Sequence, residues 1–408
     1  MKRSDGPFPF DSFDPFGFME RAWTRGWFDN FSNSHFLIMA LEHRLNKFDW
    51  EYQFVSNTTM DVFTPLSPNG KIDFRQFSDN FIANLSTKLA VLEQRFGSDE
   101  IRNFVVNQLS AGKNNYSADA FFQALSEIEI LCFYCRIDWS AYIYEPPVGI
   151  HGANPEARFE YVLPSINGVS QKIQVNVEVK TPRFPILKNP KQRVALPTIL
   201  LSDEGRKKVQ HLCGLNNMKC LLPRVTKLVS FLNSAASKFD TPKENQYNIL
   251  YINWSYSDFP SASFLEPWSL LTNELNGILT HRDIGLNLPF KEPLRPDVYN
   301  KITAIVVYSS SLDQLMFSDF RDAWKTSELA GSRFRMYVLD KKLEKRELSN
   351  ELTPLFKITG MRPDSPEKEH WRVLTNFNRD ENNSFSQKVK DSDFERSLRR
   401  VINTYYLP

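Results

Sequence analysis

Apolar residues in the first quarter of the chain recur mostly at the three- and four-residue spacing of amphipathic helices. Ser34 is a suitable N-cap, and the apolar positions that follow it predict a helix from about Phe36. A longer apolar stripe from Phe74 to Phe96 predicts one long amphipathic helix, and a third helix is expected from Ser98 to about Leu109. Residues 34–112 are therefore predicted to form a helical region.

The residues before this region have a different composition. Residues 1–33 place many phenylalanines among Pro, Gly and Asp, which predicts an extended arm that packs on a neighbouring surface. The N-terminus also lacks the continuous apolar core of a signal peptide. No segment of the chain reaches the roughly 20 consecutive apolar residues that a membrane span requires. We therefore expect a cytoplasmic protein with no membrane partner.

The middle of the chain changes from helical to strand periodicity. A helix capped by Ser117 is expected to bury Leu125, Ile128, Cys132 and Cys135. Three strands, a helix and a strongly apolar strand are predicted to follow, at 139–144, 158–163, 172–180, 223–238 and 247–254. This order of elements predicts an α/β fold in residues 113–260, with one mixed sheet flanked by helices.

The pattern is weaker beyond residue 260. Apolar runs at 302–308 and 334–340 predict two more strands, which would extend the same sheet. Several prolines between Phe290 and Pro296 are also compatible with a linker. Residues 261–408 are therefore expected to be either a C-terminal extension of the core or a small second domain.

Two of the predicted strands carry charged residues on one face. Because side chains alternate along a strand, Asn176, Glu178 and Lys180 point to the side opposite the intervening valines. On the preceding strand, Glu156 and Glu160 lie opposite the apolar face. If the apolar faces of both strands pack against one layer, two residues that lie opposite each other must have residue numbers that add to an even number. The loop around Asn167-Gly168 should then hold an odd number of residues, rather than the two that Asn-Gly often indicates.

The arrangement resembles the active site of a known superfamily of nucleases. A helix carries Glu127-Ile128-Glu129, Pro155-Glu156 leads into a strand, and a turn then precedes Glu178-Val179-Lys180. In this order and spacing, the segments resemble the PD-(D/E)XK nuclease superfamily, whose fold is restriction-endonuclease-like. The chain departs from the family pattern at Glu156, where an Asp is most common.

The resemblance implies a role for each of these charged residues. Glu178, together with Glu156 or Glu160, is expected to bind Mg²⁺ or Mn²⁺, and Lys180 to activate the attacking water and steady charge in the transition state. Glu127 or Glu129 is expected to join the metal site from the helix. These expectations agree with the preference of Mg²⁺ for carboxylate oxygens.

A basic segment surrounds the proposed catalytic pair. Residues 172–238 hold 13 Lys or Arg against three acidic residues, although the net charge of the whole chain is only +2. A clustered basic surface attracts a phosphate backbone, although a solvated lysine-rich loop would have the same composition. The residues predicted to bind nucleic acid are Lys172, Arg183, Lys188, Lys191, Arg193, Arg206, Lys207 and Lys208.

Other kinds of chemistry receive little support. The chain has four cysteines, and neither Cys132 with Cys135 nor His211 with Cys213 and Cys220 has the paired spacing of a structural zinc site. There is no G-x-x-x-x-G-K-[ST] loop, no G-x-S-x-G elbow and no H-E-x-x-H pair in the sequence. An ATP-driven motor, a serine hydrolase of that type and a zinc protease are therefore not indicated.

The sequence thus predicts a Mg²⁺-dependent endonuclease that hydrolyses phosphodiester bonds in DNA, as in restriction or phage defence. A second hypothesis is a catalytically inactive scaffold with a nuclease-like fold that binds nucleic acid or a protein partner. A third is an interaction protein whose Phe-rich arm docks on a partner. DNA is the expected partner, and a homo-oligomer or a protein partner is the alternative.

Overall fold

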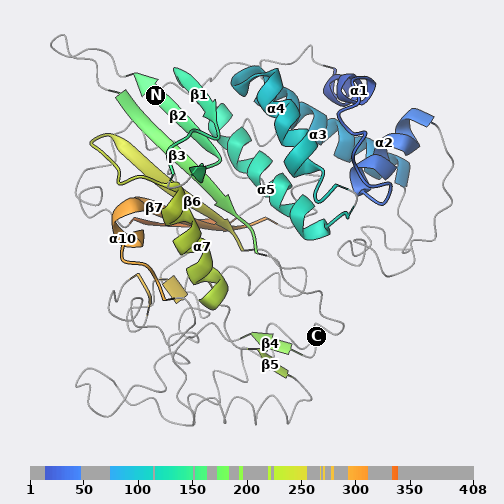
Figure 1. The fold of residues 1–408 in the computed structure, drawn as a ribbon. Helices are drawn as coiled ribbons and strands as arrows, with labels where there is room; N and C mark the ends of the chain where they lie inside the picture. Colours follow the sequence, from blue (N-terminus) through green and yellow to red (C-terminus); the bar gives the residue numbers. More distant parts are fainter. Residues whose placement is uncertain are drawn as a thin grey trace, which may run out of the picture.

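The computed structural model describes residues 14–46, 74–113, 115–149, 152–162, 172–182, 193–195, 219–221, 225–254, 267, 270–271, 277–279, 293–310 and 333–338. These residues form an α/β fold in which a mixed sheet lies between helices (Figure 1). Within them, no helix combines the length and the apolar character needed to cross a membrane.

The described strands form one large sheet and one small one. The large sheet has six strands in the order β1-β2-β3-β6-β7-β8, and the small one pairs β4 with β5. The β3·β6 and β6·β7 pairs are parallel, and the other pairs of the large sheet are antiparallel. The strands are β1 (Ala141–Tyr144), β2 (Ala157–Val162), β3 (Lys172–Lys180), β4 (Arg193–Ala195), β5 (Lys219–Leu221), β6 (Gln246–Asn253), β7 (Ala304–Ser309) and β8 (Arg333–Val338).

Helices cover both faces of this sheet. The described helices are α1 (Gly17–Thr24), α2 (Phe36–Asn46), α3 (Phe74–Phe96), α4 (Ser98–Phe104), η2 (Val105–Leu109), α5 (Ala118–Cys135), α7 (Val225–Lys238) and α10 (Val298–Lys301). The N-terminal helices lie on the side of α5, and α7 crosses the other face (Figure 1). The predicted order of helix, three strands, helix and strand is found as α5, β1, β2, β3, α7 and β6, with the small pair β4 and β5 before α7.

Ser117 caps α5 as predicted, because its hydroxyl accepts a hydrogen bond from the Ala120 amide. The buried face of α5 then packs on the sheet through aromatic rings. The Tyr134 ring stacks on Phe159 of β2 with centroids 4.6 Å apart, and its hydroxyl lies 2.9 Å from the Tyr251 hydroxyl of β6. A stacked buried pair adds about 0.5–1.5 kcal/mol beyond the area it buries. These contacts fix α5 across the centre of the sheet.

The prediction of an extended N-terminal arm is wrong for the described part of that segment. Residues 17–24 form the helix α1, and the side chains of Phe18, Phe28 and Phe31 are buried in the same core as α2 and α3. Mutual packing of these rings stabilises the helix and turns, which local composition does not encode. Residues 1–13 lie outside the described residues.

The register of β2 and β3 confirms the predicted parity of their connection. Ala157 lies opposite Val177 and Val162 lies opposite Lys172, so residues 163–171, which are nine and therefore odd in number, separate the paired positions. One step beyond this register, Glu156 falls across from Glu178. The two carboxylates are thus on the same sheet face, as the alternation of side chains requires.

Candidate active site

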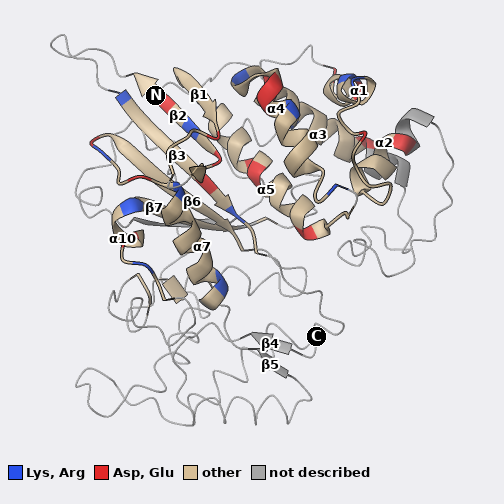
Figure 2. Ribbon diagram, viewed as in Figure 1, with Lys and Arg blue, Asp and Glu red and all other residues tan. Residues whose placement is uncertain are grey.

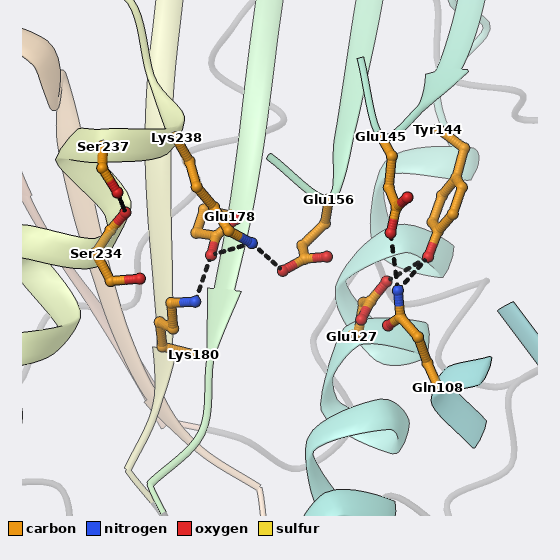
Figure 3. A network of polar contacts seen from close by, with 10 residues as sticks. All are labelled: Gln108, Glu127, Tyr144, Glu145, Glu156, Glu178, Lys180, Ser234, Ser237 and Lys238. Atoms are coloured by element: carbon orange, nitrogen blue, oxygen red, sulfur yellow. Dashed lines mark hydrogen bonds and ion pairs between the residues drawn. The ribbon is translucent and has the colours of Figure 1, made fainter. Parts of the chain in front are cut away.

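Two carboxylates and two lysines converge at the end of β3 (Figure 3). Lys180 Nζ lies 2.6 Å from Oε1 of Glu178. Lys238, the last residue of α7, places its Nζ 2.9 Å from the same oxygen and 3.2 Å from Oε1 of Glu156. Acidic and basic segments therefore lie next to one another at this end of β3 (Figure 2).

Glu178 is the most enclosed member of this group. Its side chain is 0% exposed, and its Oε2 has no hydrogen-bond partner among the described residues. Burial raises the pKa of Glu178 to about 7, and the charge of Glu156 adds to this effect, while Lys180 and Lys238 act in the opposite direction. An enclosed carboxylate with an unused oxygen can therefore accept a proton or a further cation.

A chain of hydrogen-bonded polar side chains positions Glu178 on this sheet face. Arg158 Nε donates to Asn176 Oδ1 at 2.8 Å, and Asn176 Nδ2 donates to Asn248 Oδ1 at 2.7 Å. Asn248 in turn donates to the carbonyls of Asp240 and Lys301, each at 2.7 Å. These hydrogen bonds, of which the one between Asn176 and Asn248 is buried, connect β2, β3 and β6 two residues before Glu178 and so restrict its position.

Lys238 joins the candidate site although no sequence pattern singles it out. A lysine in the last turn of a helix is common, because it complements the helix dipole. Burial acts to lower the pKa of Lys238, but the charges of Glu156 and Glu178 outweigh it, so the pKa is raised and the side chain is an ammonium ion. Only the packing of α7 on the sheet reveals that this ammonium meets both predicted acids.

A second polar group faces Glu156 from the α5 side. Glu127 of α5 is buried and accepts a hydrogen bond from the Tyr144 hydroxyl at 3.3 Å. Gln108 donates to the Tyr144 hydroxyl at 2.8 Å and to Glu145 at 2.9 Å. Burial raises the pKa of Glu127 well above its usual value, and the charge of Glu156 raises it further. Glu127 is therefore the helix carboxylate that belongs to the site.

The backbone just after β1 is strained where it contacts Glu156. Glu145 has a φ of 44°, which is in the left-handed region that non-glycine residues seldom adopt. Its amide nitrogen donates to the carbonyl of Glu156 at 3.0 Å. Such strain persists where surrounding contacts over-determine the conformation, and here it fixes the start of β2 beside Glu178.

The other two candidate acids are not part of this group, which corrects the prediction. Glu160 lies toward the far end of β2, where it pairs with Lys172 Nζ at 2.5 Å and accepts from Gln174 at 2.8 Å. Glu129 points toward α3 and pairs with Lys88 at 2.9 Å. Glu160 is four positions from Glu156 along the strand, and the two-residue step from Glu127 to Glu129 turns the side chain to another side of α5, so each acid is separated from its neighbour in the candidate site.

Most residues predicted to bind nucleic acid cannot be assigned to the site. Lys172 and Lys180 stand at opposite ends of β3, roughly 26 Å apart for eight steps along a strand, so Lys172 does not join the group. Only the backbone of Arg193 is described, as part of β4. The remaining predicted residues, Arg183, Lys188, Lys191, Arg206, Lys207 and Lys208, lie outside the described residues.

A cavity of about 520 Å³ opens beside the converging charges. Asn107, Gln108, Gln123 and Glu127 are polar lining residues from η2 and α5, and Lys227, Ser230 and Ser234 line the cavity from α7. Glu156, Lys180 and Thr181 line it at the strand ends, and small or apolar residues such as Ala124, Val179 and Phe231 contribute the remaining surface. The α7 residues are spaced by three and four, so they share one face of the helix. The wall from α7 therefore presents hydrogen-bond donors to the cavity.

The oxygen ligands fit one divalent cation rather than a crowded metal cluster. In the described part of the chain, no group of three or more His, Cys, Asp or Glu side chains is placed to bind a metal. Glu156 and Glu178 nevertheless share one cation, the Lys238 ammonium, and Glu178 keeps a buried, unpartnered oxygen. Since Mg²⁺ is usually bound by one or two carboxylates together with water and substrate phosphate, this donor set suits it.

Comparison of the chain with protein-family models, with curated proteins and with solved structures found no match in any of the three. The geometry of Glu156, Glu178, Lys180 and Lys238 is therefore the guide to what this chain can do chemically.

Proposed function

We propose that the chain is a divalent-metal-dependent nuclease of the PD-(D/E)XK type, with a restriction-endonuclease-like core, and that it hydrolyses phosphodiester bonds in DNA. The observation that carries the proposal is the meeting of Glu156, Glu178 and Lys180 at the ends of two adjacent strands. Glu156 precedes Glu178 and Lys180 by more than 20 residues in the sequence. Their convergence is what the proposed chemistry requires.

Glu156 and Glu178 are the residues that would bind Mg²⁺ or Mn²⁺, and Glu127 is the helix carboxylate that lines the same cavity as Glu156. The ion, when bound, supplies positive charge that stabilises the phosphoryl oxygens and favours ionisation of a water. Lys180 stands next to Glu178 with its ammonium 2.6 Å from the carboxylate. From there it can orient the attacking water and stabilise the negative charge that develops during the displacement.

The cavity supplies a place for the scissile phosphate. Lys180 and Lys227 provide positive charge, and the hydroxyls of Ser230 and Ser234 provide further donors on the same side. Burial and the charge of Glu156 raise the pKa of Glu127 well above its usual value, which weakens the repulsion between this carboxyl group and an incoming phosphate. Phosphate contacts of this kind give affinity without sequence preference.

A plasmid-cleavage assay with Mg²⁺ or Mn²⁺ tests the proposal. We expect the wild type to cut DNA and EDTA to abolish the activity. Glu178→Gln and Lys180→Met should each lower the cleavage rate by about 10²-fold or more, because each removes a group that acts on the reacting atoms. Glu160→Gln is the matched control, since Glu160 lies on the same sheet face but pairs with Lys172. Equal activity in Lys180→Met and wild type would contradict the proposed role of the lysine.

One observation favours the second candidate, a catalytically inactive scaffold that binds nucleic acid or a protein partner. Lys238 already bridges Glu156 and Glu178, and an ammonium in this place neutralises the two acids without any metal. The scaffold would show no cleavage by the wild type with any divalent ion, together with salt-sensitive DNA binding or binding to a protein partner. A role in restriction or phage defence is proposed only for the active nuclease.

A further inference from the structure

Lys238 occupies the position between the two acids where the proposed metal would bind. Its Nζ is 2.9 Å from Glu178 and 3.2 Å from Glu156 (Figure 3). We propose that Lys238 is a built-in counter-ion, and that its ammonium and a divalent cation compete for the space between Glu156 and Glu178. This inference rests on the proposed metal site, but it concerns how that site is loaded rather than the cleavage itself.

The competition follows from distances and charge. Mg²⁺ needs its oxygen ligands at about 2.0–2.1 Å, whereas the ammonium nitrogen now lies about 3 Å from the same two oxygens. An ion bound to both carboxylates would therefore overlap the Lys238 ammonium or stand in direct repulsion with it. One of the two cations has to leave.

The environment explains why a cation is needed when metal is absent. The Glu178 side chain is 0% exposed and that of Glu156 is 12% exposed, so two carboxylates face each other largely out of water. Enclosed like charges are unfavourable unless a cation compensates for them. Lys180 contacts only the Glu178 side of the pair in the described structure, whereas Lys238 contacts both carboxylates.

The position of Lys238 allows its side chain to move without disturbing the fold. It is the last residue of α7, and its side chain is 21% exposed, so Lys238 lies at the edge of the packed region. The backbone that follows is fixed, because Phe239 is fully buried and the Asp240 carbonyl accepts from Asn248 at 2.7 Å. Displacement therefore requires only rotations about the flexible four-carbon side chain.

A counter-ion that competes with metal differs measurably from an ordinary structural ion pair. Removing the lysine charge would lower the stability of the metal-free protein in both cases, because Glu156 and Glu178 would lose the positive charge that compensates them. Only removal of a competitor would also strengthen metal binding. Metal affinity measured without DNA is therefore the informative readout.

The test is calorimetric titration of the full chain with Mn²⁺, without DNA. Lys238→Met keeps a side chain of similar length without its charge, and we expect its Kd for Mn²⁺ to be about tenfold lower than that of the wild type, or lower still. Lys238→Arg should bind Mn²⁺ no more tightly than the wild type. The matched control is Lys172→Met, which removes a lysine paired with Glu160 at the other end of β3 and should leave the Kd unchanged.

A second measurement uses the wild type, in case Lys238→Met does not fold. Mn²⁺ should increase acetylation of Lys238 by an amine-reactive reagent, measured by mass spectrometry, because displacement exposes the ammonium. The acetylation of Lys172 should not change. Unchanged or weaker Mn²⁺ binding by folded Lys238→Met, or unchanged or decreased acetylation of Lys238, would overturn the inference.

The outcomes separate this inference from the proposed nuclease function. Tighter Mn²⁺ binding by Lys238→Met with no DNA cleavage by the wild type would support the competition and refute the nuclease. Metal-dependent cleavage by the wild type with equal Mn²⁺ affinity in both proteins would refute the competition and leave the nuclease standing.

Discussion

Lys88 of α3 and Glu129 of α5 form an ion pair inside the N-terminal core, with Nζ 2.9 Å from Oε2 and each side chain only 3% exposed. This pair accounts for Glu129, which the family resemblance left as an alternative metal ligand beside Glu127. The carboxylate is directed away from the cavity and compensates a buried ammonium. Its function is therefore expected to be structural.

Removal of the Glu129 charge should destabilise the fold without affecting chemistry. Glu129→Ala leaves the Lys88 ammonium in the core without its carboxylate, which costs about 3–5 kcal/mol of unfolding free energy. The double variant Lys88→Met with Glu129→Leu should recover most of this loss. Urea denaturation measures the stability. A Glu129 variant that remains folded but loses metal binding would show that the assignment to Lys88 is wrong.

His35 should make the N-terminal helices sensitive to acid. Its Nε2 hydrogen bonds to the Leu109 carbonyl at 2.9 Å, and its Nδ1 accepts from the Leu37 amide at 3.0 Å, so a neutral ring satisfies both contacts. Burial lowers the pKa of His35 to about 4. Because the folded pKa lies below the unfolded value of about 6.5, this contribution to stability is present above pH 6.5 and is lost as the pH falls toward 4.

The unfolding free energy lost through protonation of His35 amounts to roughly 3 kcal/mol between about pH 6.5 and pH 4. His35→Gln can still donate to Leu109 but does not titrate. The unfolding free energy of the wild type, relative to that of His35→Gln, should therefore decrease between pH 7 and pH 4.5 in urea titrations. Parallel pH profiles for the two proteins would refute the prediction.

Glu178 should make the stability of the fold depend on pH with a sign opposite to that of His35. Burial raises the pKa of Glu178 to about 7, above that of an unfolded glutamate, so its contribution to stability is fully present below about pH 4.5 and is lost as the pH rises through 7. The wild type should therefore lose stability relative to Glu178→Gln between pH 5 and pH 8. Mn²⁺ affinity should increase over the same interval, because protons compete with the ion for this carboxylate. Calorimetric Mn²⁺ titrations at several pH values check the second part, and an affinity that does not change with pH would contradict it.

Phe28 tests whether the N-terminal segment is part of the core or a docking arm. Its ring is buried and lies 5.2 Å from the Phe31 ring, centroid to centroid. Phe28→Ala should lower the unfolding free energy by about 3–5 kcal/mol. Asn30→Ala, at an exposed position in the same turn, should change it by less than about 0.5 kcal/mol. Unchanged stability with an altered oligomeric state in Phe28→Ala would instead favour the docking arm.

Local periodicity was sufficient to predict several elements of the fold. The stripe in α5, its Ser117 cap and the alternation along β3 are properties of neighbouring residues, so the sequence determined the helix, the strand and the common face of Glu178 and Lys180. The parity of the β2–β3 connection followed from the same alternation and is confirmed by the register. The N-terminal phenylalanines were misjudged, because their helix depends on packing against α2 and α3.

Tertiary structure alone decided which candidate residues meet. Glu156 and Glu160 share a strand face, and Glu127 and Glu129 share a helix, so no local pattern could choose between the members of either pair. The choice depends on strand register and on the rotation of α5. The position of Lys238 depends on the packing of α7, which begins 45 residues after β3 ends. Periodicity specifies the direction of a side chain from its own backbone, whereas distances between separate elements are set by the packing of the whole core.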